Sequence, residues 1–536
     1  MTDPVPGSSA RAGTVLGAVS APARGAVDER GLVTPGIDAG WALDWWIGAE
    51  DRWHLPQVEA SVRQRLVDDV PVVETAMRVP GGDVLHRAYV VHDRVDEVVV
   101  EIENRTAVPV ALALVVRRTG ATASAPGPQV RIDGAALLVG DEVGVRLPSS
   151  PNASVLCPPG AEPAAAVVFP LAHTAVLRVA LPLVDEARPD GASTPPTGLP
   201  PAARVAAGWA AQLRQGTRLE LPGESLAALV QASRAFLLLA HGGDHLVGAA
   251  PGDETVAVLR ALDEWGFHRQ AAQVLAAGAD VPATGATLVA LVRHWQLSRD
   301  RELVDLLSTS LAAGVSRLGR GGRRRTGDAV EEARWRVRGL RAAAEVLADT
   351  GQPDAAAKVA RRAEELAVVS PPMSKIAPAT DEWRSSLDDL VRETDLAVIR
   401  HHPPTGAAFL GAFRSLLVRE VDGAAPGDRR LALCSLWPSE WRGQSLEVHG
   451  APTTHGRLSY AVRWHGERPA LLWELEPHDE GTDDDAAVGA VTLLAPGLDT
   501  TWASRDPRGE ALLAVPRVDG SESSGGSRPE EGASFS

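Results

Sequence analysis

The segment Trp41–Trp53 carries the most concentrated set of side chains that could recognise a ligand. It holds four of the 14 Trp of the chain, beside carboxylates and an arginine. Sugar rings stack on exposed indoles while neighbouring charged groups bond to hydroxyls, so Trp41, Trp45 and Trp46 are candidate substrate-binding residues for an oligosaccharide. The alternative, which we favour for most of them, is that these indoles fill a sandwich core or a domain interface, since each buries about 150–250 Å².

Other catalytic and metal-binding patterns are missing from the sequence. His449, His455 and His465 lie beside turn glycines, at spacings that match no usual metal site. Two cysteines, Cys157 and Cys434, are too few for a disulfide framework or a Cys-based metal site. The chain has no nucleophile elbow, no P-loop and no dinucleotide-binding glycine motif between a strand and a helix. We therefore expect no cofactor and no metal, and neither triad hydrolysis nor nucleotide-dependent chemistry.

The charge balance argues against a nucleic-acid partner. With 69 acidic and 53 basic residues the net charge is −16, a field that repels phosphate backbones. The basic run Arg320–Arg325 has no interleaved aromatics and is best explained as a solvated loop. The first residues lack a signal-peptide pattern, and no stretch approaches about 18 consecutive apolar residues. We expect no membrane association and a cytoplasmic location.

Hydrophobic periodicity divides the chain into three parts. A period of two holds up to about residue 184 and returns after about 407, whereas a helical period holds between 222 and 397. This order predicts a multidomain α+β protein with an N-terminal antiparallel β-sandwich, an αα-hairpin domain and a C-terminal β-domain. The predicted boundaries are 1–35 for a disordered N-terminus, 36–184 for the sandwich, 185–221 for a linker, 222–400 for the helices, 401–516 for the C-terminal β-domain and 517–536 for a disordered tail.

Individual hairpins follow from the same patterns. The predicted β-hairpins pair Val98–Glu103 with Val108–Val116, Val70–Val79 with Val84–Val91, and Leu458–His465 with Leu471–Leu475. The clearest helical hairpin joins a helix ending near Leu347 to one beginning near Ala356, through the stop, turn and N-cap of Gly351–Asp354. About eight helices are expected, and because no hairpin buries its apolar face alone, they must stack.

Three segments, in this order, give the chain a family resemblance. Gly252–His268 with Ala271–Leu275 resembles the stretch of glucoamylase- and trehalase-type glycosidases in which an Arg-Asp pair opens a helix. Thr287–Trp295 resembles the "Leu-Val-Ala-Leu…His-Trp" helix that follows there. Gly456–Gly466 with Pro469–Glu474 looks like a β-segment near the C-terminus of related bacterial proteins.

The resemblance implies a toroid of six helical hairpins behind an N-terminal sandwich, and hydrolysis of α-glucosides with inversion, without a metal in the chemistry. An inverting enzyme uses two carboxyl groups about 6.5–9.5 Å apart. Asp253 matches the Asp of the Arg-Asp pair and is the candidate sugar-binding residue; Glu254 is the candidate catalytic acid. This chain departs from the pattern at Gly252, where the family has Arg.

Two further departures leave open whether the toroid is complete and whether its hydrolysis is retained or lost. Residues 222–400 are fewer than the about 200 that twelve helices and their loops require. No segment matches the general-acid and general-base regions, and Glu331-Glu332 and Asp381-Glu382 are better explained as helix-start carboxylates. The leading hypothesis is a glycoside hydrolase-like protein that binds an oligosaccharide. The rival is a non-catalytic helical scaffold for a protein partner. We also expect the two β-domains to meet through their Trp clusters.

Overall fold

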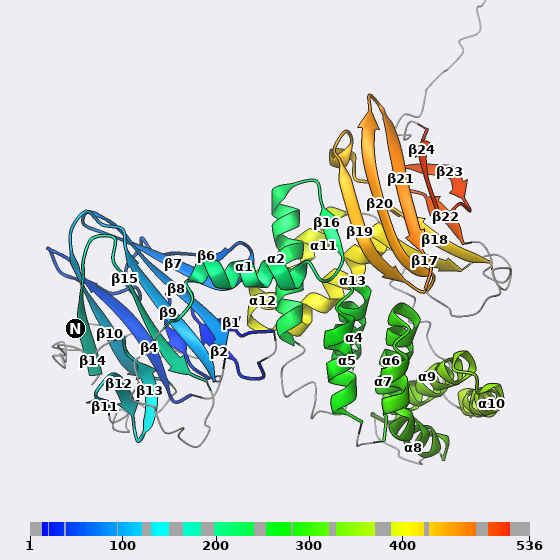
Figure 1. Cartoon of the computed structure of the whole chain (residues 1–536), viewed down its shortest axis with the longest axis horizontal. Helices are drawn as coiled ribbons and strands as arrows, with labels where there is room; N and C mark the ends of the chain where they lie inside the picture. Colours follow the sequence, from blue (N-terminus) through cyan, green and yellow to red (C-terminus); the bar gives the residue numbers. More distant parts are fainter. Residues whose placement is uncertain are drawn as a thin grey trace, which may run out of the picture.

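The computed structural model describes residues 13–19, 21–36, 39–93, 95–119, 130–148, 165–183, 198–240, 253–279, 282–320, 328–369, 387–422, 428–478 and 491–514. Figure 1 shows three parts in the predicted order: a β-sandwich at one end, helices in the middle and a second β-domain at the other end. The predicted fold class, a sandwich followed by αα-hairpins and a C-terminal β-segment, is therefore confirmed.

Two antiparallel sheets form the N-terminal sandwich. One has the strand order β1-β2-β3-β4-β10-β14, with β5 paired to β4, and the other has the order β11-β12-β13-β15-β9-β8-β7-β6. Their bounds are β1 Thr14–Leu16, β2 Gly25–Val27, β3 Val33–Thr34, β4 Trp41–Gly48, β5 Trp53–His54, β6 Arg63–Val67, β7 Val70–Val79, β8 Gly82–His92, β9 Asp96–Asn104, β10 Val110–Arg118, β11 Val130–Asp133, β12 Ala136–Val139, β13 Glu142–Arg146, β14 Ala165–Leu171 and β15 Val176–Pro182.

One predicted hairpin of the sandwich is confirmed and another is wrong. Strands β7 and β8 pair across a turn in which Gly81 and Gly82 have positive φ. In contrast, β9 pairs with β8 and β15, whereas β10 pairs with β4 and β14 in the opposite sheet. The buried side chain of Asn104 forms this corner, because its amide donates to the carbonyls of Val108 and Leu171, each at 3.0 Å. Both strands alternate in hydrophobicity, and alternation does not distinguish a hairpin from a crossover between sheets.

His86 on β8 is buried in the sandwich core against Trp45. The two rings stack with centroids 5.1 Å apart, and burial lowers the pKa of His86 from 6.5 to about 3. Below pH 6.5 the unfolded chain therefore binds a proton that the folded protein does not. Above pH 6.5, His86 does not change the unfolding free energy. As the pH drops from 6.5 towards 3, His86 lowers the unfolding free energy by up to about 1.4 kcal/mol per pH unit.

Replacing His86 by Leu is expected to remove this component of the acid sensitivity. From pH 6.5 to 4.5, the unfolding free energy of the wild type should fall relative to that of His86→Leu by up to about 1.4 kcal/mol per pH unit. Urea denaturation of both proteins at pH 7.5, 6 and 5 measures the difference. A difference that stays constant over this range would contradict a neutral, buried His86.

The middle of the chain is helical. The helices are α1 Ala202–Leu213, α2 Glu224–Ala240, α4 Asp253–Glu264, α5 His268–Ala277, α6 Gly285–Ser298, α7 Arg301–Leu306, α8 Ser308–Gly319, α9 Asp328–Asp349, α10 Pro353–Val369, α11 Leu387–Glu393, α12 Leu396–His401 and α13 Gly406–Leu417, with short 3-10 turns η2 Pro403–Thr405 and η3 Ser439–Trp441. The predicted hairpin of α9 and α10 is confirmed, and Gly351 ends α9 with a φ of 83°. Glu331 and Glu332 lie near the start of α9, as expected, whereas Asp381 and Glu382 lie outside the described residues.

The described helices form an open array. Packing continues from α12 through α2, α13, α4 and α6 to α9 and α10. Figure 1 shows α12 and α10 far apart at the two ends of this series, so the described helices do not close into a ring. The length of this region predicted fewer than the twelve helices of a complete toroid, but twelve α-helices lie between Ala202 and Leu417 in the described part of the chain.

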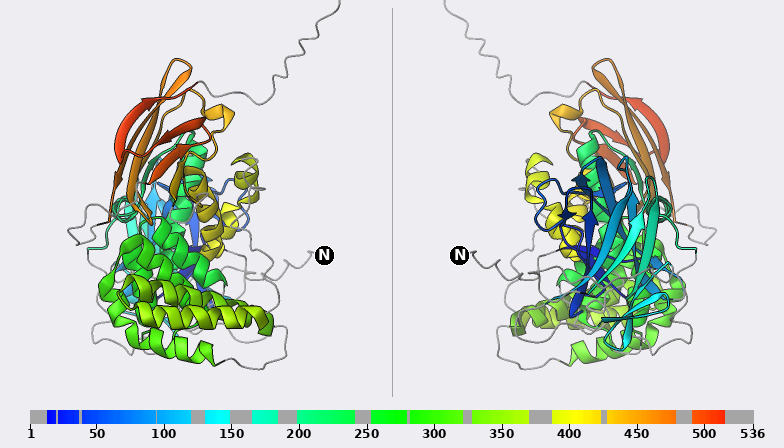
Figure 2. Two further views of the ribbon diagram at one scale, coloured as in Figure 1. Left: turned by 90° about the vertical axis from the view of Figure 1, so that its right-hand side faces the viewer. Right: turned by 90° about the vertical axis from the view of Figure 1, so that its left-hand side faces the viewer.

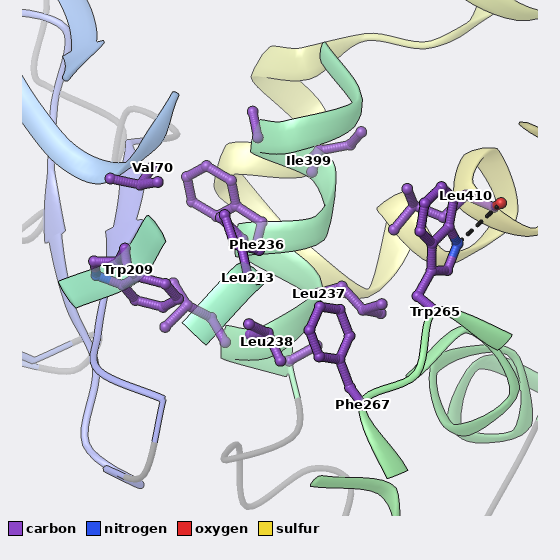
Figure 3. Close-up of a cluster of buried hydrophobic side chains, with 14 of the residues drawn as sticks. Val70, Trp209, Leu213, Phe236, Leu237, Leu238, Trp265, Phe267, Ile399 and Leu410 are labelled. Carbon is purple, nitrogen blue, oxygen red and sulfur yellow. Dashed lines mark hydrogen bonds between the residues drawn. The ribbon is translucent and has the colours of Figure 1, made fainter. Parts of the chain in front are cut away.

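Helix α2 is the centre of the molecule. Its second half is buried throughout, from Ala232 to Ala240, and the one charged side chain in it, Arg234, donates to the carbonyls of Leu213 and Thr217. Figure 3 shows Trp209 and Val70 on one side of α2 and Trp265 and Phe267 on the other. The indole of Trp265 donates to the carbonyl of Leu410 at 3.2 Å. This core joins the sandwich to the helical array.

The C-terminal β-domain has two sheets, with the strand orders β16-β19-β20-β21-β24 and β17-β18-β22-β23. Figure 2 shows these strands standing above the helices α4 to α10. Their bounds are β16 Arg218–Glu220, β17 Val418–Asp422, β18 Arg429–Leu433, β19 Leu446–Thr453, β20 Gly456–His465, β21 Arg468–Glu476, β22 Thr492–Ala495, β23 Asp499–Ser504 and β24 Arg508–Leu512. The predicted hairpin of β20 and β21 is confirmed.

Three predicted domain boundaries need correction. Within the stretch expected to be disordered, β1, β2 and β3 join the first sandwich sheet, and they are too short to show a period in the sequence. The expected linker holds α1 and β16, because the Pro-rich residues that suggested it end before Ala202. The predicted C-terminal β-domain begins with α13, which packs on α2 and α4. The predicted tail lies outside the described residues.

The two β-domains do not meet through Trp side chains. Figure 1 shows them at opposite ends of the molecule, with α1, α2 and α13 between them. Each Trp cluster is used within its own domain: Trp45 packs in the sandwich core, and Trp437, Trp441 and Trp464 form a cluster beside η3. The expectation of a shared Trp interface is therefore wrong, because the helices separate the domains.

Candidate functional site

The two acidic residues predicted to act on a sugar lie at the start of α4. Asp253 is its first residue, and the side chain of Asp253 lies outside the described part of the chain. The Glu254 carboxylate is 52% exposed, and its Oε1 lies 3.5 Å from Nδ1 of His402, just before η2. Glu254 is therefore accessible to a ligand, but it lacks the apolar enclosure that surrounds general-acid carboxylates in many enzymes.

The predicted sugar-binding Trp residues lie elsewhere, on β4 of the sandwich. Trp45 is 1% exposed and donates its indole N–H to the carbonyl of Arg30 at 3.1 Å; Trp46 is 6% exposed and donates to Asp44 at 3.1 Å. Both rings are covered by other side chains, so the prediction that they stack on sugars is wrong. Each fills a hydrophobic core of the sandwich domain, which was the alternative prediction for these indoles. Trp41 is half-buried at the end of the same strand. The structure does not bring β4 together with the start of α4 (Figure 1).

A cavity of about 380 Å³ lies between the start of α2, α11 and η3. Its polar lining includes Ser225 and three charged residues, Glu224, Glu440 and Arg392. Trp441 also lines the cavity but is only 5% exposed, and Leu226 is among the apolar side chains. This volume lies within the range of small-molecule sites, and a few polar groups on an apolar wall are their usual composition.

Trp441 belongs to a cluster of three indoles, with Trp437 and Trp464. Trp437 packs edge-on against Trp441 with centroids 5.6 Å apart, and Trp464 lies 6.1 Å from Trp437. The short turn η3 carries both Glu440 and Trp441, and Gln444 donates to the Glu440 carbonyl at 2.7 Å. The side of the cavity formed by η3 is therefore supported by packed indoles of the C-terminal domain and is not an isolated loop.

A buried ionic network lies deeper, where the helices meet the C-terminal sheets. Glu264 at the end of α4 accepts from Arg260 at 2.8 Å and from Arg293 at 3.1 Å, and Arg293 also contacts Glu420 at 3.0 Å. Burial alone would raise the pKa of Glu264, but the nearby guanidinium groups, including that of Arg414, outweigh it and lower the pKa to about 2. Glu264 therefore stays ionised and is paired with arginine side chains. This suits it to holding the helices and the C-terminal sheets together rather than to donating protons.

Next to this network, Asp263 contacts two histidines. Nδ1 of His294 lies 2.8 Å from Oδ1 of Asp263, and Nδ1 of His268 lies 2.9 Å from the same oxygen. Gly266, with a φ of 81°, turns the chain between α4 and α5 and so returns His268 to the last turn of α4. Nε2 of His294 faces Oδ2 of Asp300 at 3.6 Å.

Sequence reasoning missed both the cavity residues and this cluster. Glu224 and Glu440 are brought together only by tertiary structure, and the one local signal was Trp441 within a Trp-rich region. His268 and His294 lie inside two of the segments that carry the resemblance, yet their spacing matches no metal motif. Among the described residues, none of His449, His455 and His465 joins a cluster of potential metal ligands.

Comparisons with known proteins give structural matches only. No family model and no curated protein sequence matches the chain. Among solved structures, a bacterial glucoamylase complexed with acarbose is similar with a TM-score of 0.43 and 10% identity, covering 68% of this chain and 67% of that chain. A putative kojibiose phosphorylase from human microbiome is similar with a TM-score of 0.42 and 7% identity, covering 85% and 86%. No described helix is long and apolar enough to cross a membrane.

Proposed function

We propose that this protein binds an oligosaccharide, and that the cavity between α2, α11 and η3 is the binding site. The observation that carries the proposal is the lining: Glu224, Glu440 and Arg392 offer acceptors and donors for hydroxyl groups, beside apolar side chains such as Leu226. Sugars present this combination, with apolar C–H faces beside hydroxyls that require hydrogen bonds. A small apolar ligand would match none of these three charged side chains.

Binding variants of the two cavity carboxylates test this proposal. Glu224→Gln and Glu440→Gln are each expected to weaken binding of α-linked oligosaccharides at least about tenfold, the effect of about 1.4 kcal/mol. Glu302→Gln is the matched control, because Glu302 also lies in the first turn of a helix but does not line the cavity. Thermal shift and titration calorimetry across di- and oligosaccharides measure the affinities. Equal affinities in all four proteins would exclude the cavity as the site.

We further propose that hydrolysis of α-glucosides with inversion, if it is retained, uses the start of α4. Glu254 would protonate the leaving oxygen and Asp253 would hold the sugar. The support is the resemblance of the segment and the exposure of Glu254. Release of reducing sugar by the wild type, abolished in Asp253→Asn and Glu254→Gln, is the expected result. Undiminished turnover in both variants would remove these residues from the reaction.

The open helical array favours a second candidate, a non-catalytic scaffold. Helices α9 and α10 form the outer end of the array, and α9 packs on α6. Stacked hairpins of this kind present a continuous surface to a protein partner in helical-repeat proteins. A complete lack of saccharide binding, together with a stable complex that is lost on deleting α9 and α10, would favour the scaffold.

A further inference from the structure

Three potential metal ligands from three helices converge in the middle of the array. Asp263 comes from α4, His268 from the start of α5 and His294 from α6, and their ligand atoms all lie within 4.8 Å of one another. Asp263 and His294 are fully buried, whereas the His268 side chain is 29% exposed. Two of the three potential ligands are thus buried, and solvent reaches the cluster through the third, His268.

Hydrogen bonding among these side chains leaves one buried carboxylate oxygen unsatisfied. Both imidazoles direct Nδ1 at one oxygen of Asp263, Oδ1. The other oxygen, Oδ2, is buried with no hydrogen-bond partner in the described part of the structure, whereas Nε2 of His294 faces the carboxylate of Asp300 at 3.6 Å. Buried polar atoms without partners are uncommon and call for an explanation such as an ion at the site.

A metal ion accounts for the convergence. Zinc bound by His nitrogen and carboxylate oxygen at about 2.0–2.2 Å places tetrahedral ligand atoms about 3.3 Å apart. The two Nδ1–Oδ1 separations of 2.8 and 2.9 Å are hydrogen-bonding distances, and they need to open by only about half an ångström to admit the ion. If His294 binds the ion through Nδ1, the Asp300 carboxylate faces its other nitrogen, Nε2. Histidines that bind a metal commonly donate their second N–H to a carboxylate in this way.

We propose that Asp263, His268 and His294 bind a divalent transition-metal ion such as Zn²⁺, with solvent completing the coordination on the exposed side of His268. Two imidazoles select a transition metal over Mg²⁺ or Ca²⁺, which prefer oxygen ligands. The ion ties α4, the start of α5 and α6 together, so its role is to stabilise the helical array. This inference is independent of the proposed saccharide site.

The test compares chelator-treated wild type with His268→Gln, the variant of the most exposed ligand. Titration calorimetry with Zn²⁺ is expected to give one equivalent bound by the wild type, and affinity at least tenfold weaker in His268→Gln. Zn²⁺ should raise the melting temperature of the wild type, whereas Mg²⁺ should not. Cobalt(II) should give the visible absorption of a four-coordinate site in the wild type and not in the variant.

His449→Gln is the matched control, because His449 also faces a carboxylate, Glu447, at 3.0 Å but belongs to no three-ligand cluster among the described residues. It should bind Zn²⁺ as the wild type does. Circular dichroism and the melting temperature without metal check that His268→Gln is folded. Failure of the chelator-treated wild type to bind Zn²⁺, or equal Zn²⁺ affinity in His268→Gln, would overturn the proposal and leave Asp263 as a hydrogen-bond acceptor for two histidines.

Discussion

Replacing Arg414 by Met is expected to destabilise the protein by about 3–5 kcal/mol, the usual cost of removing one partner of a buried ionic cluster. Arg414 on α13 is fully buried by its surroundings and donates to three backbone carbonyls, those of Glu264, Val418 and Pro452. These acceptors belong to the end of α4, the start of β17 and β19. Methionine fills similar space but leaves all three carbonyls, and part of the Glu264 charge, without compensation.

Arg317→Met is the control for this loss. Arg317 also donates to two backbone carbonyls, those of Pro282 and Ala283, but its guanidinium lies at the surface, where water replaces the lost donor. Its cost should stay within about 0.5 kcal/mol. Urea denaturation followed by circular dichroism measures both values. Similar losses of unfolding free energy in the two variants would contradict the proposed role of Arg414, which is to link the helices to the C-terminal sheets through hydrogen bonds.

Replacing Gly339 by Ala is expected to destabilise the protein by about 1–3 kcal/mol, although alanine favours a helix. Gly339 on α9 faces Gly285 at the start of α6, and an added Cβ would lie 2.5 Å from the Gly285 Cα. A Cβ at Gly285 would lie 2.1 Å from the Trp335 carbonyl oxygen. The two helices touch through their backbones here, so an extra methyl group must push α9 and its partner α10 away from α6.

Gly411→Ala in the middle of α13 is the matched substitution. No atom lies within 4 Å of a Cβ added at Gly411, so its only effect is on helix propensity, and it should stabilise by about 0.5–1 kcal/mol. Opposite signs for the two glycines in thermal and urea unfolding are the expected result. Stabilisation by Gly339→Ala would show that α6 and α9 do not approach so closely in solution.

The order of the three parts was predictable because the hydrophobic period changes between them. The α9–α10 hairpin was predictable residue by residue, since Gly351 and Pro353 mark the turn chemically. Helix α1 was missed although Ala202, Ala206, Trp209 and Leu213 are buried at helical spacing, because most of its other residues are also Ala or small. The assignment of β9 and β10 to different sheets depends on the bonds of Asn104, which periodicity does not contain.

The candidate sites were less predictable than the fold. The prediction of Asp253 and Glu254 depends on a short local resemblance, which involves only consecutive residues. The cavity combines Glu224, Arg392 and Glu440 from three distant stretches, and only the packing of α2 and α11 on η3 brings them together. The Asp263 cluster likewise requires the turn at Gly266 and the packing of α4 on α6.

Strand β16 has a consequence for how the chain is made. Arg218–Glu220 pair with Glu447–His449 of β19, so an edge of the C-terminal sheet is synthesised roughly 230 residues before its partner. At the usual 5–20 residues per second, a ribosome needs at least about 10 s to deliver β19. During that time β16 is an unpaired strand attached to the central helix α2, available to any nascent neighbour with a free edge. Completion of the protein's core is therefore a late event of translation, and slow synthesis lengthens the interval in which the chain can misassociate.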